Sequence, residues 1–363
     1  MHFFTTTTLG LLFVAVVAVA FPAERELSAH PRKCTEENVI KRKEWSSMSA
    51  KERKAYIRAV QCLMTKPSRY DPGVVPASTS YYSDFAAAHA NLSLSIHISG
   101  IFLSWHRHFV WLMEEALHNE CDYPAGLGIP YWNWPDYTRL PLEYSALFDG
   151  SETSLGSNGI PLQGRQPAVL SEAEVPRFQG DLAPGTVLPL GSGGGCVFGG
   201  PFALSTVHFG TFVGQLPDDW TQPRPQCLKR DLNDWFLRMF NHGARVDAMM
   251  SARDIEQFQW RLEPIHAAGH RAVGGQMTNF FISPSDPVFY LHHGQIDRLW
   301  TLWQAENESR RYQYNGTSTI YNPVGVTPEV DNDTVITFVP VGEDVTLREV
   351  ANPMSGRYCY VYV

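Results

Sequence analysis

The spacing of apolar positions along the chain predicts a protein built mainly of helices. In the segment 35–66, apolar side chains recur every three to four residues, and Thr35 with Glu37 begins a helix-capping signal. The segment 67–80 lacks this period and is expected to form an extended loop. The same period predicts further helices over residues 81–91, 102–119, 229–243, 251–259, 263–273 and 286–306.

Three other stretches interrupt this pattern. A proline-rich aromatic turn, PYWNWPDY, occupies residues 130–137. Glycine and proline become dense from 138 to 228, so this stretch is expected to be mostly loop with short turns. The tail over 323–363 alternates Val, Thr and Tyr, which is typical of short strands. Together the patterns predict a helical core with long loops and a little sheet.

The N-terminal residues 1–20 have the composition of a secretory signal peptide. They contain no acidic residue, are largely apolar from Leu9 onward and end in an A-x-A cleavage pattern. A membrane anchor is the less favoured interpretation, because the apolar run is short for a spanning helix and no stop-transfer pattern follows. The sequence therefore predicts a secreted, extracellular protein whose mature part is residues 21–363.

Six cysteines are scattered along the chain, and none belongs to a C-x-x-C pair of the kind that binds zinc. An even number of cysteines in a secreted chain suggests disulfides. Spacing alone leaves every pairing open; the arrangement we favour is Cys34–Cys359, Cys62–Cys121 and Cys196–Cys227. Four N-x-[ST] sequences fit the same compartment as candidate glycosylation sites: Asn91, Asn307, Asn315 and Asn332.

The charge of the chain limits its partners. The formal net charge is −8, and no run of basic residues interrupts the acidic balance. Nucleic acid and anionic membrane lipid are therefore not expected as partners. Hydrophobic residues make up 44% of the chain and aromatic residues 12%, which suffices for a large core, whether in one domain or two.

Histidine placement gives the clearest chemical signal in the sequence. His89 lies near the end of one predicted helix, His97 follows in the connecting segment, and His106 lies inside the next helix. These three imidazoles can meet if the two helices pack side by side. Other histidines lack such spacing and are expected at the surface or outside a ligand shell: His2, His30, His108, His118, His208 and His242.

A second group of histidines follows later in the chain. His266 and His270 are four residues apart and share one helical face, and His293 lies on the next predicted helix. Imidazole suits Cu, Zn, Fe and Ni. The lack of a carboxylate within either group argues against a di-iron site, and H-A-A-G-H lacks the glutamate of the H-E-x-x-H metalloproteases. Two adjacent three-histidine copper sites are the most economical interpretation.

Two longer motifs surround these histidines. The first consists of His97, Phe102, Trp105-His106-Arg107 and Glu114. The second consists of Asp286-Pro287, Phe289, His293 and Asp297. Both resemble the copper signatures of the type 3 copper proteins, the family of tyrosinase, catechol oxidase and haemocyanin. The resemblance runs from Tyr81 to Trp303, includes the PYWNW turn, and is greatest to short secreted fungal polyphenol oxidases.

This resemblance implies a mainly α fold, in which a four-helix-bundle core surrounds a dinuclear copper centre, with long loops and a few short β-strands. It implies that dioxygen is the co-substrate and that small phenols are the partners: o-diphenols become o-quinones, and dioxygen becomes water. The oligomeric state stays open, and a monomer is compatible. The copper ligands that it implies are His89, His97 and His106 for one ion and His266, His270 and His293 for the other.

Three other functions stay open from the sequence. The first is a tyrosinase with true monophenol hydroxylase activity, or one that acts on o-methoxyphenols or aminophenols. The second is a haemocyanin-like dioxygen carrier, although the signal peptide, the short chain and the lack of repeated units argue against it. The third is a di-zinc hydrolase that uses the same histidines.

Several positions near the implied ligands are expected to influence the substrate. Phe280 stands where some relatives place an aromatic gate above one copper, with Phe281 as the neighbouring alternative. Ala267 replaces an asparagine that, with an upstream glutamate, holds a water in many monophenol hydroxylases, and Gln257 has the nearest upstream spacing. These differences predict diphenol oxidation with weak monophenol hydroxylation. Arg271 is expected to add a cation at the entrance.

The motif FYLHHGQIDRLW places His292 and His293 side by side, about 100° apart on a helix. The family signature H-x-x-x-D assigns copper binding to His293 and leaves His292 to form hydrogen bonds behind the ligand shell. Asp297 completes this signature and is expected either to orient a ligand imidazole or to close the helix packing. A surface pair between Asp297 and Arg298 is the alternative.

The C-terminal end bears on domain organisation. Tyr358-Cys359-Tyr360 resembles the Tyr-x-Tyr motif after which long family members continue into a C-terminal domain that covers the site. Because the sequence stops three residues later, we expect a single copper domain over residues 21–363 with no C-terminal lid.

Overall fold

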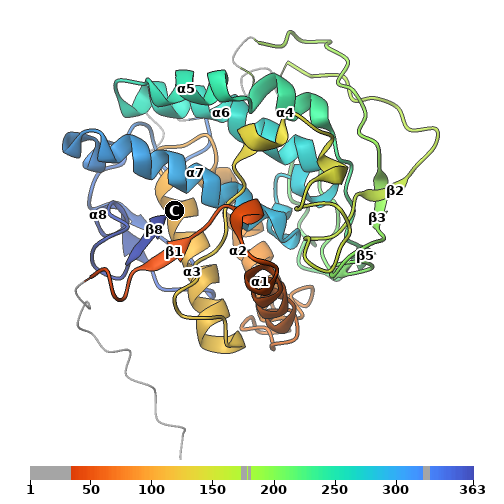
Figure 1. The fold of residues 1–363 in the computed structure, drawn as a ribbon, viewed down its shortest axis with the longest axis horizontal. Helices are drawn as coiled ribbons and strands as arrows, with labels where there is room; N and C mark the ends of the chain where they lie inside the picture. The colour runs from red at the N-terminus through yellow and green to blue at the C-terminus, as the bar shows by residue number, and fades with distance from the viewer. Residues whose placement is uncertain (1–33, 173–177, 179–180, 322–327) are drawn as a thin grey trace, which may run out of the picture.

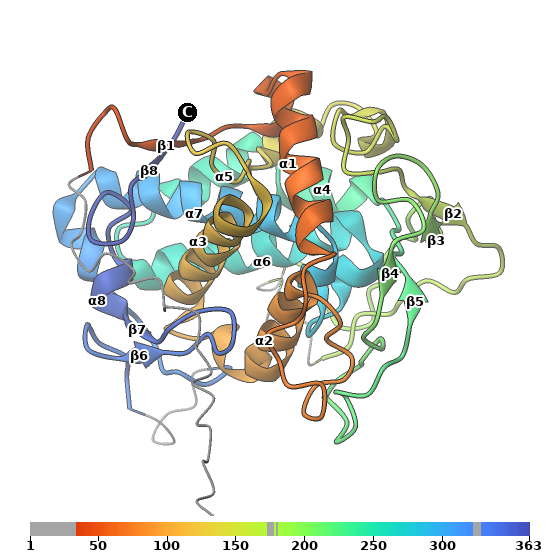
Figure 2. The ribbon, with the colours of Figure 1, turned by 90° about the horizontal axis from the view of Figure 1, so that it is seen from below.

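Four helices form the core of the computed structural model, and Figures 1 and 2 show them packed around one another. They are α2 (Tyr81–Ile96), α3 (Phe102–Cys121), α6 (Ile255–Val273) and α7 (Val288–Ala305). Helix α3 packs against both α2 and α7, and α6 packs against α7. The prediction of a mainly α fold with a helical core is confirmed.

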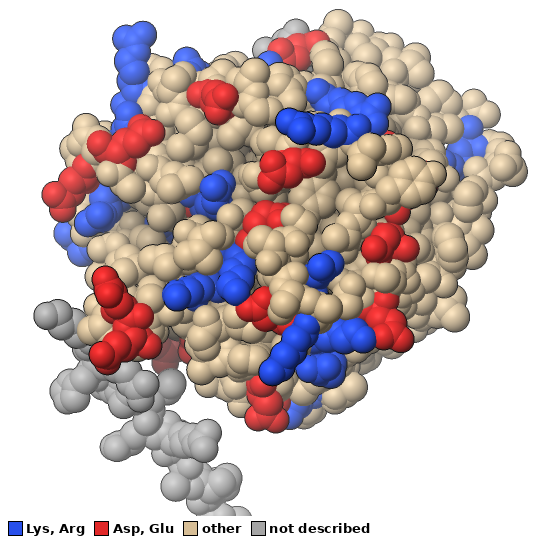
Figure 3. All heavy atoms as spheres, in the orientation of Figure 1, with Lys and Arg blue, Asp and Glu red and all other residues tan. Residues whose placement is uncertain are grey.

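The structure describes residues 34–172, 178, 181–321 and 328–363. The predicted signal peptide at residues 1–20 therefore lies outside the described residues. None of the described helices is both long and apolar enough to cross a membrane. On the face shown in Figure 3, acidic and basic side chains are interspersed, and no continuous basic patch of the kind that binds nucleic acid covers that face.

The helix that carries the first histidine begins and ends at side chains that bind its backbone. Helix α2 starts at Ser80, which forms a capping box with Ser83. It runs to Ile96, beyond the predicted end at residue 91. The Ser93 hydroxyl donates to the His89 carbonyl, one turn earlier, at 2.7 Å, so this serine is accommodated within the helix.

The segment before the core differs from its prediction as a helix over 35–66. Its first part contains the strand β1 (Ile40–Arg42), which pairs in parallel with β8 (Tyr360–Tyr362), side by side in Figure 2. Helix α1 (Ala50–Leu63) begins only at Ser49, where a capping box with Glu52 is present. The backbone partners that β8 supplies override the local helical pattern of 40–42, since propensity is a weak prior.

Two other helix predictions are corrected. The segments 251–259 and 263–273 form one helix, α6, which contains Pro264. The predicted break at residues 260–262 is therefore absent, and the helix also continues through Pro264, although a proline removes a backbone donor. The predicted helix over 229–243 is irregular up to Asn233, because the backbone of Arg230 pairs with Gly194 and Gly195. It then forms α4 (Asp234–Phe240) and α5 (Gly243–Met250).

The region 138–228 is mostly loop, as predicted, and carries two small antiparallel sheets. Their strands are β2 (Gly159–Pro161) with β3 (Gly194–Val197), and β4 (Thr206–Val207) with β5 (Gln226–Cys227). The favoured disulfide pairing is confirmed in full: Cys34–Cys359, Cys62–Cys121 and Cys196–Cys227. Arg230, which lies just after this region, forms a buried ion pair of 2.8 Å with Asp286 in the segment before α7.

The tail forms short strands, as predicted, but also a helical turn that the pattern did not predict. The strands β6 (Val335–Ile336) and β7 (Val345–Thr346) pair in antiparallel fashion. The turn α8 (Leu347–Val350) begins at a capping box between Thr346 and Glu349. Short 3-10 segments complete the described chain: Trp45–Ser47, Trp134–Tyr137, Leu142–Tyr144, Gly275–Thr278, Ser283–Ser285 and Glu308–Tyr312.

Candidate metal centre

Three histidines from α2, its C-terminal end and α3 form one buried cluster. The ring centroids lie 4.9 Å apart for His89 and His97, 5.8 Å for His89 and His106, and 5.2 Å for His97 and His106. Each Nδ1 lies at 2.7–2.9 Å from a backbone carbonyl oxygen, to which it donates its proton. Nε2 is therefore the atom with a free lone pair on each ring.

Four histidines from α6 and α7 form a second cluster, in which one ring nitrogen of each residue lies within 4.8 Å of those of the others. His266 and His270 project from one face of α6, and their Nε2 atoms are 3.1 Å apart. His270 donates from Nδ1 to the Met277 carbonyl at 2.8 Å, which again leaves Nε2 free for a metal ion. The other two members are His292 and His293 of α7.

The two clusters face each other. The rings of His106 and His293 are stacked, with centroids 4.3 Å apart, and those of His97 and His266 are 6.2 Å apart and nearly parallel. Imidazoles from four helices therefore meet in the core of the bundle, and two metal ions bound there would be neighbours.

The electrostatics of the clusters favour metal binding. Burial lowers the pKa of His89 to about 4, and burial together with the neighbouring imidazoles lowers the pKa of His97 and His106 well below its ordinary value. These rings are neutral near pH 7, which is the form that binds metals. Nε2 of His89 and of His106 is buried without a hydrogen-bond partner among the described residues. A metal ion would satisfy these atoms.

The donor set fits copper. Each cluster consists of imidazoles, with no carboxylate among its described members. Neutral imidazole suits copper and zinc, whereas carboxylate-rich sets hold di-iron centres. The residues present therefore fit the two three-histidine sites predicted from the sequence, with one histidine left over on α7.

The positions of His292 and His293 differ, although both are buried. His293 stacks on His106 and so lies between the two clusters. The ring of His292 lies against the backbone of α6, where a Cβ at position Gly269 would meet its Cε1 at 2.2 Å. It also lies beside Trp134, with ring centroids 5.2 Å apart. His292 nevertheless belongs to the second cluster, with its ring 4.5 Å from that of His270. The prediction of His293 as the ligand therefore rests on the family signature and on its contact with His106.

A cleft of about 220 Å³ opens beside the clusters. It is lined by His97 and His266 together with Ala267, Arg271 and Phe280, three of the positions expected to influence the substrate. The Phe280 ring lies 4.6 Å from the His97 ring. Phe281 instead is buried and accepts the hydrogen bond of His89 through its carbonyl, so Phe280 is the aromatic residue at the cleft.

The cleft also contains a carboxylate, that of Glu263, which the sequence pattern did not predict. Glu263 lines the cleft, and its Oε2 lies 3.7 Å from Nδ1 of His266. Gln257, which was expected to serve near Ala267, lies in a neighbouring hollow and donates its side-chain amide to Asp254 at 3.1 Å. The spacing of Glu263, three residues before a predicted ligand on a helix, could have indicated it.

The signature residue Asp297 closes the helix packing and forms no surface pair. It is buried and accepts from Arg107 Nε at 2.5 Å and from Arg42 Nη1 at 3.1 Å. The hydroxyls of Tyr360 and Tyr362 donate to it at 2.6 Å each. Arg42 lies far from the signatures in the sequence, so its role in this network was not predicted.

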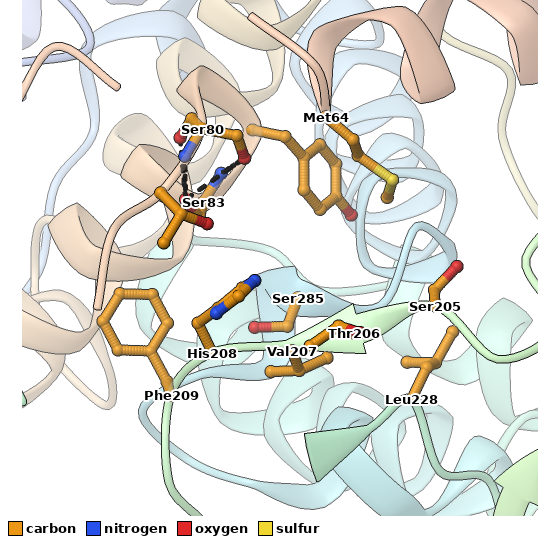
Figure 4. Close-up of a pocket in the computed structure, with 12 residues that line it drawn as sticks. Met64, Ser80, Ser83, Ser205, Thr206, Val207, His208, Phe209, Leu228 and Ser285 are labelled. Atoms are coloured by element: carbon orange, nitrogen blue, oxygen red, sulfur yellow. Dashed lines mark hydrogen bonds between the residues drawn. The ribbon is translucent and has the colours of Figure 1, made fainter. Parts of the chain in front are cut away.

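The remaining described histidines lie outside both clusters, as expected. His108 shares a hydrogen bond of 2.5 Å with the Tyr358 hydroxyl, and His118 donates to the Leu127 carbonyl at 2.9 Å. His242 precedes α5 as its N-cap. His208 lines a separate hollow of about 260 Å³ opposite Ser80 and Ser83 (Figure 4), a hollow whose other described lining residues include no histidine.

The predicted glycosylation sequons lie at the surface to different degrees. Asn91 and Asn307 are exposed, whereas Asn315 and Asn332 are partly buried. Glycosylation itself stays a prediction at all four positions.

Comparison with known proteins agrees with this geometry. Residues 79–306 match the family model described as the common central domain of tyrosinase. Tyrosinase P of Aspergillus terreus is 42% identical over 339 residues, which cover 88% of this chain and 91% of that protein. An N-acetyl-6-hydroxytryptophan oxidase of Emericella nidulans is 34% identical over 373 residues, with 96% and 97% covered. A solved mutant polyphenol oxidase of Thermothelomyces thermophila has a TM-score of 0.81 at 33% identity, with 91% and 90% covered.

Proposed function

The chain belongs to the tyrosinase family of type 3 copper proteins, and from this premise we propose that it is an extracellular oxidase of o-diphenols. Two diphenols lose two electrons and two protons each to become o-quinones, and one dioxygen takes up the four electrons and four protons to become two waters. The observation that carries the proposal is the pair of facing all-histidine clusters beside a cleft of about 220 Å³, a volume suited to one phenolic ring.

Copper, when bound, supplies the electron transfer between diphenol and dioxygen. His89, His97 and His106 would hold one ion, and His266, His270 and His293 the other. The backbone hydrogen bonds at Nδ1 fix the orientation of four of these rings in advance, so Nε2 is presented without rearrangement.

The residues of the cleft position the substrate ring. Phe280 offers an aromatic face beside His97, and Ala267 leaves room above α6. Glu263 is the one acidic residue among the described residues that line the cleft, and its Oε2 can accept a phenolic proton. Arg271 borders the same cleft, with its guanidinium over the rings of Phe178 and Phe236 at 5.5 and 5.8 Å.

Diphenols are the proposed substrates because Ala267 has no polar side-chain group that could hold a water together with Glu263 for the deprotonation of a monophenol. Oxygen uptake by the copper-loaded protein tests this with catechol and with phenol, matched in concentration. Rapid uptake with catechol and a long lag or no uptake with phenol is expected. Equal rates on both would contradict the argument from Ala267. A hydroxyindole belongs in the same assay, because one relative is an N-acetyl-6-hydroxytryptophan oxidase.

The ligand assignment has its own test. His293→Ala is expected to lower copper from two equivalents to about one, since a copper site loses a ligand. His292→Ala is expected to retain both equivalents, because the family signature assigns the metal to His293, and the His292 ring packs against Gly269 and Trp134. Copper loss from the His292 variant alone would reverse the assignment. Reversible oxygen binding without quinone formation would indicate a carrier, and zinc without copper in the native protein would indicate a hydrolase.

Secretion is supported by the three disulfides, which persist in oxidising compartments. N-terminal sequencing of the protein from culture medium tests it, with Phe21 expected as the first residue. Retention of the chain inside the cell with an intact N-terminus would contradict an extracellular role.

A further inference from the structure

The cleft at the histidine clusters borders a second and larger hollow. Glu263 and Ile98 line the cleft and also line this hollow, which has a volume of about 540 Å³. Phe102 forms the wall between the hollow and the metal centre, because its ring lies 4.7 Å from His106 and 4.8 Å from His266. A substrate that fills the cleft can therefore extend past Glu263 without leaving the protein surface.

One face of α6 runs along both spaces. Glu256, Trp260 and Glu263 lie at positions i, i+4 and i+7, so they project from the same side of the helix. His266 and His270 of the metal centre follow on the adjoining side of the helix, rotated by about 120° and about 80° from Trp260. At about 1.5 Å of rise per residue, Trp260 lies about 9 Å and Glu256 about 15 Å along the helix from His266.

The chemistry of this hollow suits an ammonium group on an apolar stem. Trp260 is 59% exposed although it is a large apolar side chain, and it lies between two carboxylates on its helix. An indole face attracts cations, and a carboxylate nearby adds charge attraction. Among the described residues that line the hollow, none is a lysine or an arginine. Leu262 and Phe102 supply apolar surface for the stem.

The border residue Ile98 has an unusual backbone. Its φ is +48°, which is rare for a β-branched residue, and its carbonyl accepts the Tyr321 N–H at 3.0 Å. Such positions persist where the surrounding structure holds them, and they concentrate at functional sites. The strained residue lies where the cleft and the hollow meet, which agrees with a continuous binding surface.

We propose that this hollow binds the distal arm of an extended diphenol, an apolar segment that ends in a protonated amine. The proposal rests on diphenol oxidation as the function: the catechol ring occupies the cleft, and the arm passes Glu263 toward Trp260 and Glu256. The amine is placed about 9–15 Å from the ring by the rise of α6. Arg271 lies further toward the C-terminal end of α6, away from this amine.

Catechols with a phenylalkyl arm of that length test the proposal, with the arm ending in an amine, a hydroxyl or a carboxylate. The copper-loaded protein is expected to show about tenfold higher kcat/KM for the amine than for the hydroxyl, and a lower value again for the carboxylate. Trp260→Ala is expected to abolish this ratio and Glu256→Gln to reduce it. Tyr144→Ala removes an exposed aromatic residue elsewhere and is expected to leave the ratio unchanged. N-glycans are removed first, because Asn315 also lines the hollow.

Binding without turnover separates this proposal from the function. The probe is 4-phenylbutylamine, which lacks hydroxyls, and ligand-detected NMR is expected to show binding to the native protein and none to Trp260→Ala. Normal catechol turnover without an amine preference, or a preference that survives in Trp260→Ala, would overturn the arm site and leave the function intact. Binding of the probe with no turnover of any catechol would support the amine site and overturn the diphenol oxidase function.

Discussion

Replacing Asp297 with asparagine tests whether its carboxylate stabilises the core or serves the copper ligands. The carboxylate pairs with Arg107 at 2.5 Å and with Arg42 at 3.1 Å, and all three side chains are buried. Arg42 keeps a second partner, Glu114 at 2.8 Å, whereas the other acceptors around Arg107 are neutral. Asparagine preserves the shape but leaves the Arg107 charge unpaired in the core.

The expected cost follows from that unpaired charge. Removing one partner of a buried pair costs about 3–5 kcal/mol, and since asparagine retains some hydrogen bonds we expect about 3 kcal/mol. With an unfolding entropy of about 2.1 cal/mol/K per residue, a chain of this size loses about 0.7 kcal/mol of stability per kelvin near its midpoint, so Tm should fall by about 4 °C. Guanidinium unfolding of the copper-free protein with disulfides intact measures the free energy directly.

The control for this experiment is Asp344→Asn, which removes a carboxylate from an exposed position. Its free energy of unfolding should stay within about 0.5 kcal/mol of the wild type. If Asp297→Asn is equally stable but binds copper more weakly, the carboxylate serves the ligands and the reasoning from the buried network is refuted.

Burial raises the pKa of Asp297, but Arg107 and Arg42 outweigh burial and hold this pKa below its ordinary value of 3.8. The ionised carboxylate therefore stabilises the folded state above pH 3.8, and this contribution is lost as the pH falls below that value. Unfolding curves of the wild type and of Asp297→Asn should converge as the pH falls through this range. Ala267→Asn is expected to shorten the lag with phenol, because an amide one helical turn from Glu263 can help to hold a water. An unchanged lag in oxygen uptake would contradict this. Replacing Cys196 and Cys227 with serine opens a loop with a sequence separation of 31. The free energy of unfolding, measured with denaturant, should fall by about 3–4 kcal/mol, while two copper equivalents remain bound. Loss of copper would show that the loop shapes the site.

The helical core and both histidine groups could be predicted because their signals are local. A period of 3.6 residues predicts α3 and α7 nearly to their ends, and the spacing of His266 and His270 places both on one face of a helix. Metal ligands must lie within a few ångströms of one another, so histidines at helical spacing on two neighbouring elements already restrict the packing.

What the sequence did not predict depends on partners far along the chain. Strand β1 exists because β8 lies beside it, and no window around residues 40–42 contains that information. Arg42 belongs to the network of Asp297 for the same reason, through a sequence separation of 255 residues. The local pattern predicts a break in α6 at residues 260–262, whereas tertiary contacts with α4, α5 and α7 keep the helix continuous through this segment and through Pro264.

Helix α6 carries both candidate metal ligands and residues proposed to determine the substrate. It carries two candidate ligands, three further residues of the cleft and the exposed Trp260 of the adjoining hollow. Contacts with α4 and α7 hold the helix in place, and Asn241 donates to the Ile265 carbonyl at 2.9 Å just before His266. The distance from the metal centre to Trp260 is therefore set by the helical rise and not by a movable loop. With the catechol ring held at the metal centre, a diphenol whose amine lies much nearer than about 9 Å to its ring is expected to fall short of Trp260, so shortening the arm should remove the amine preference.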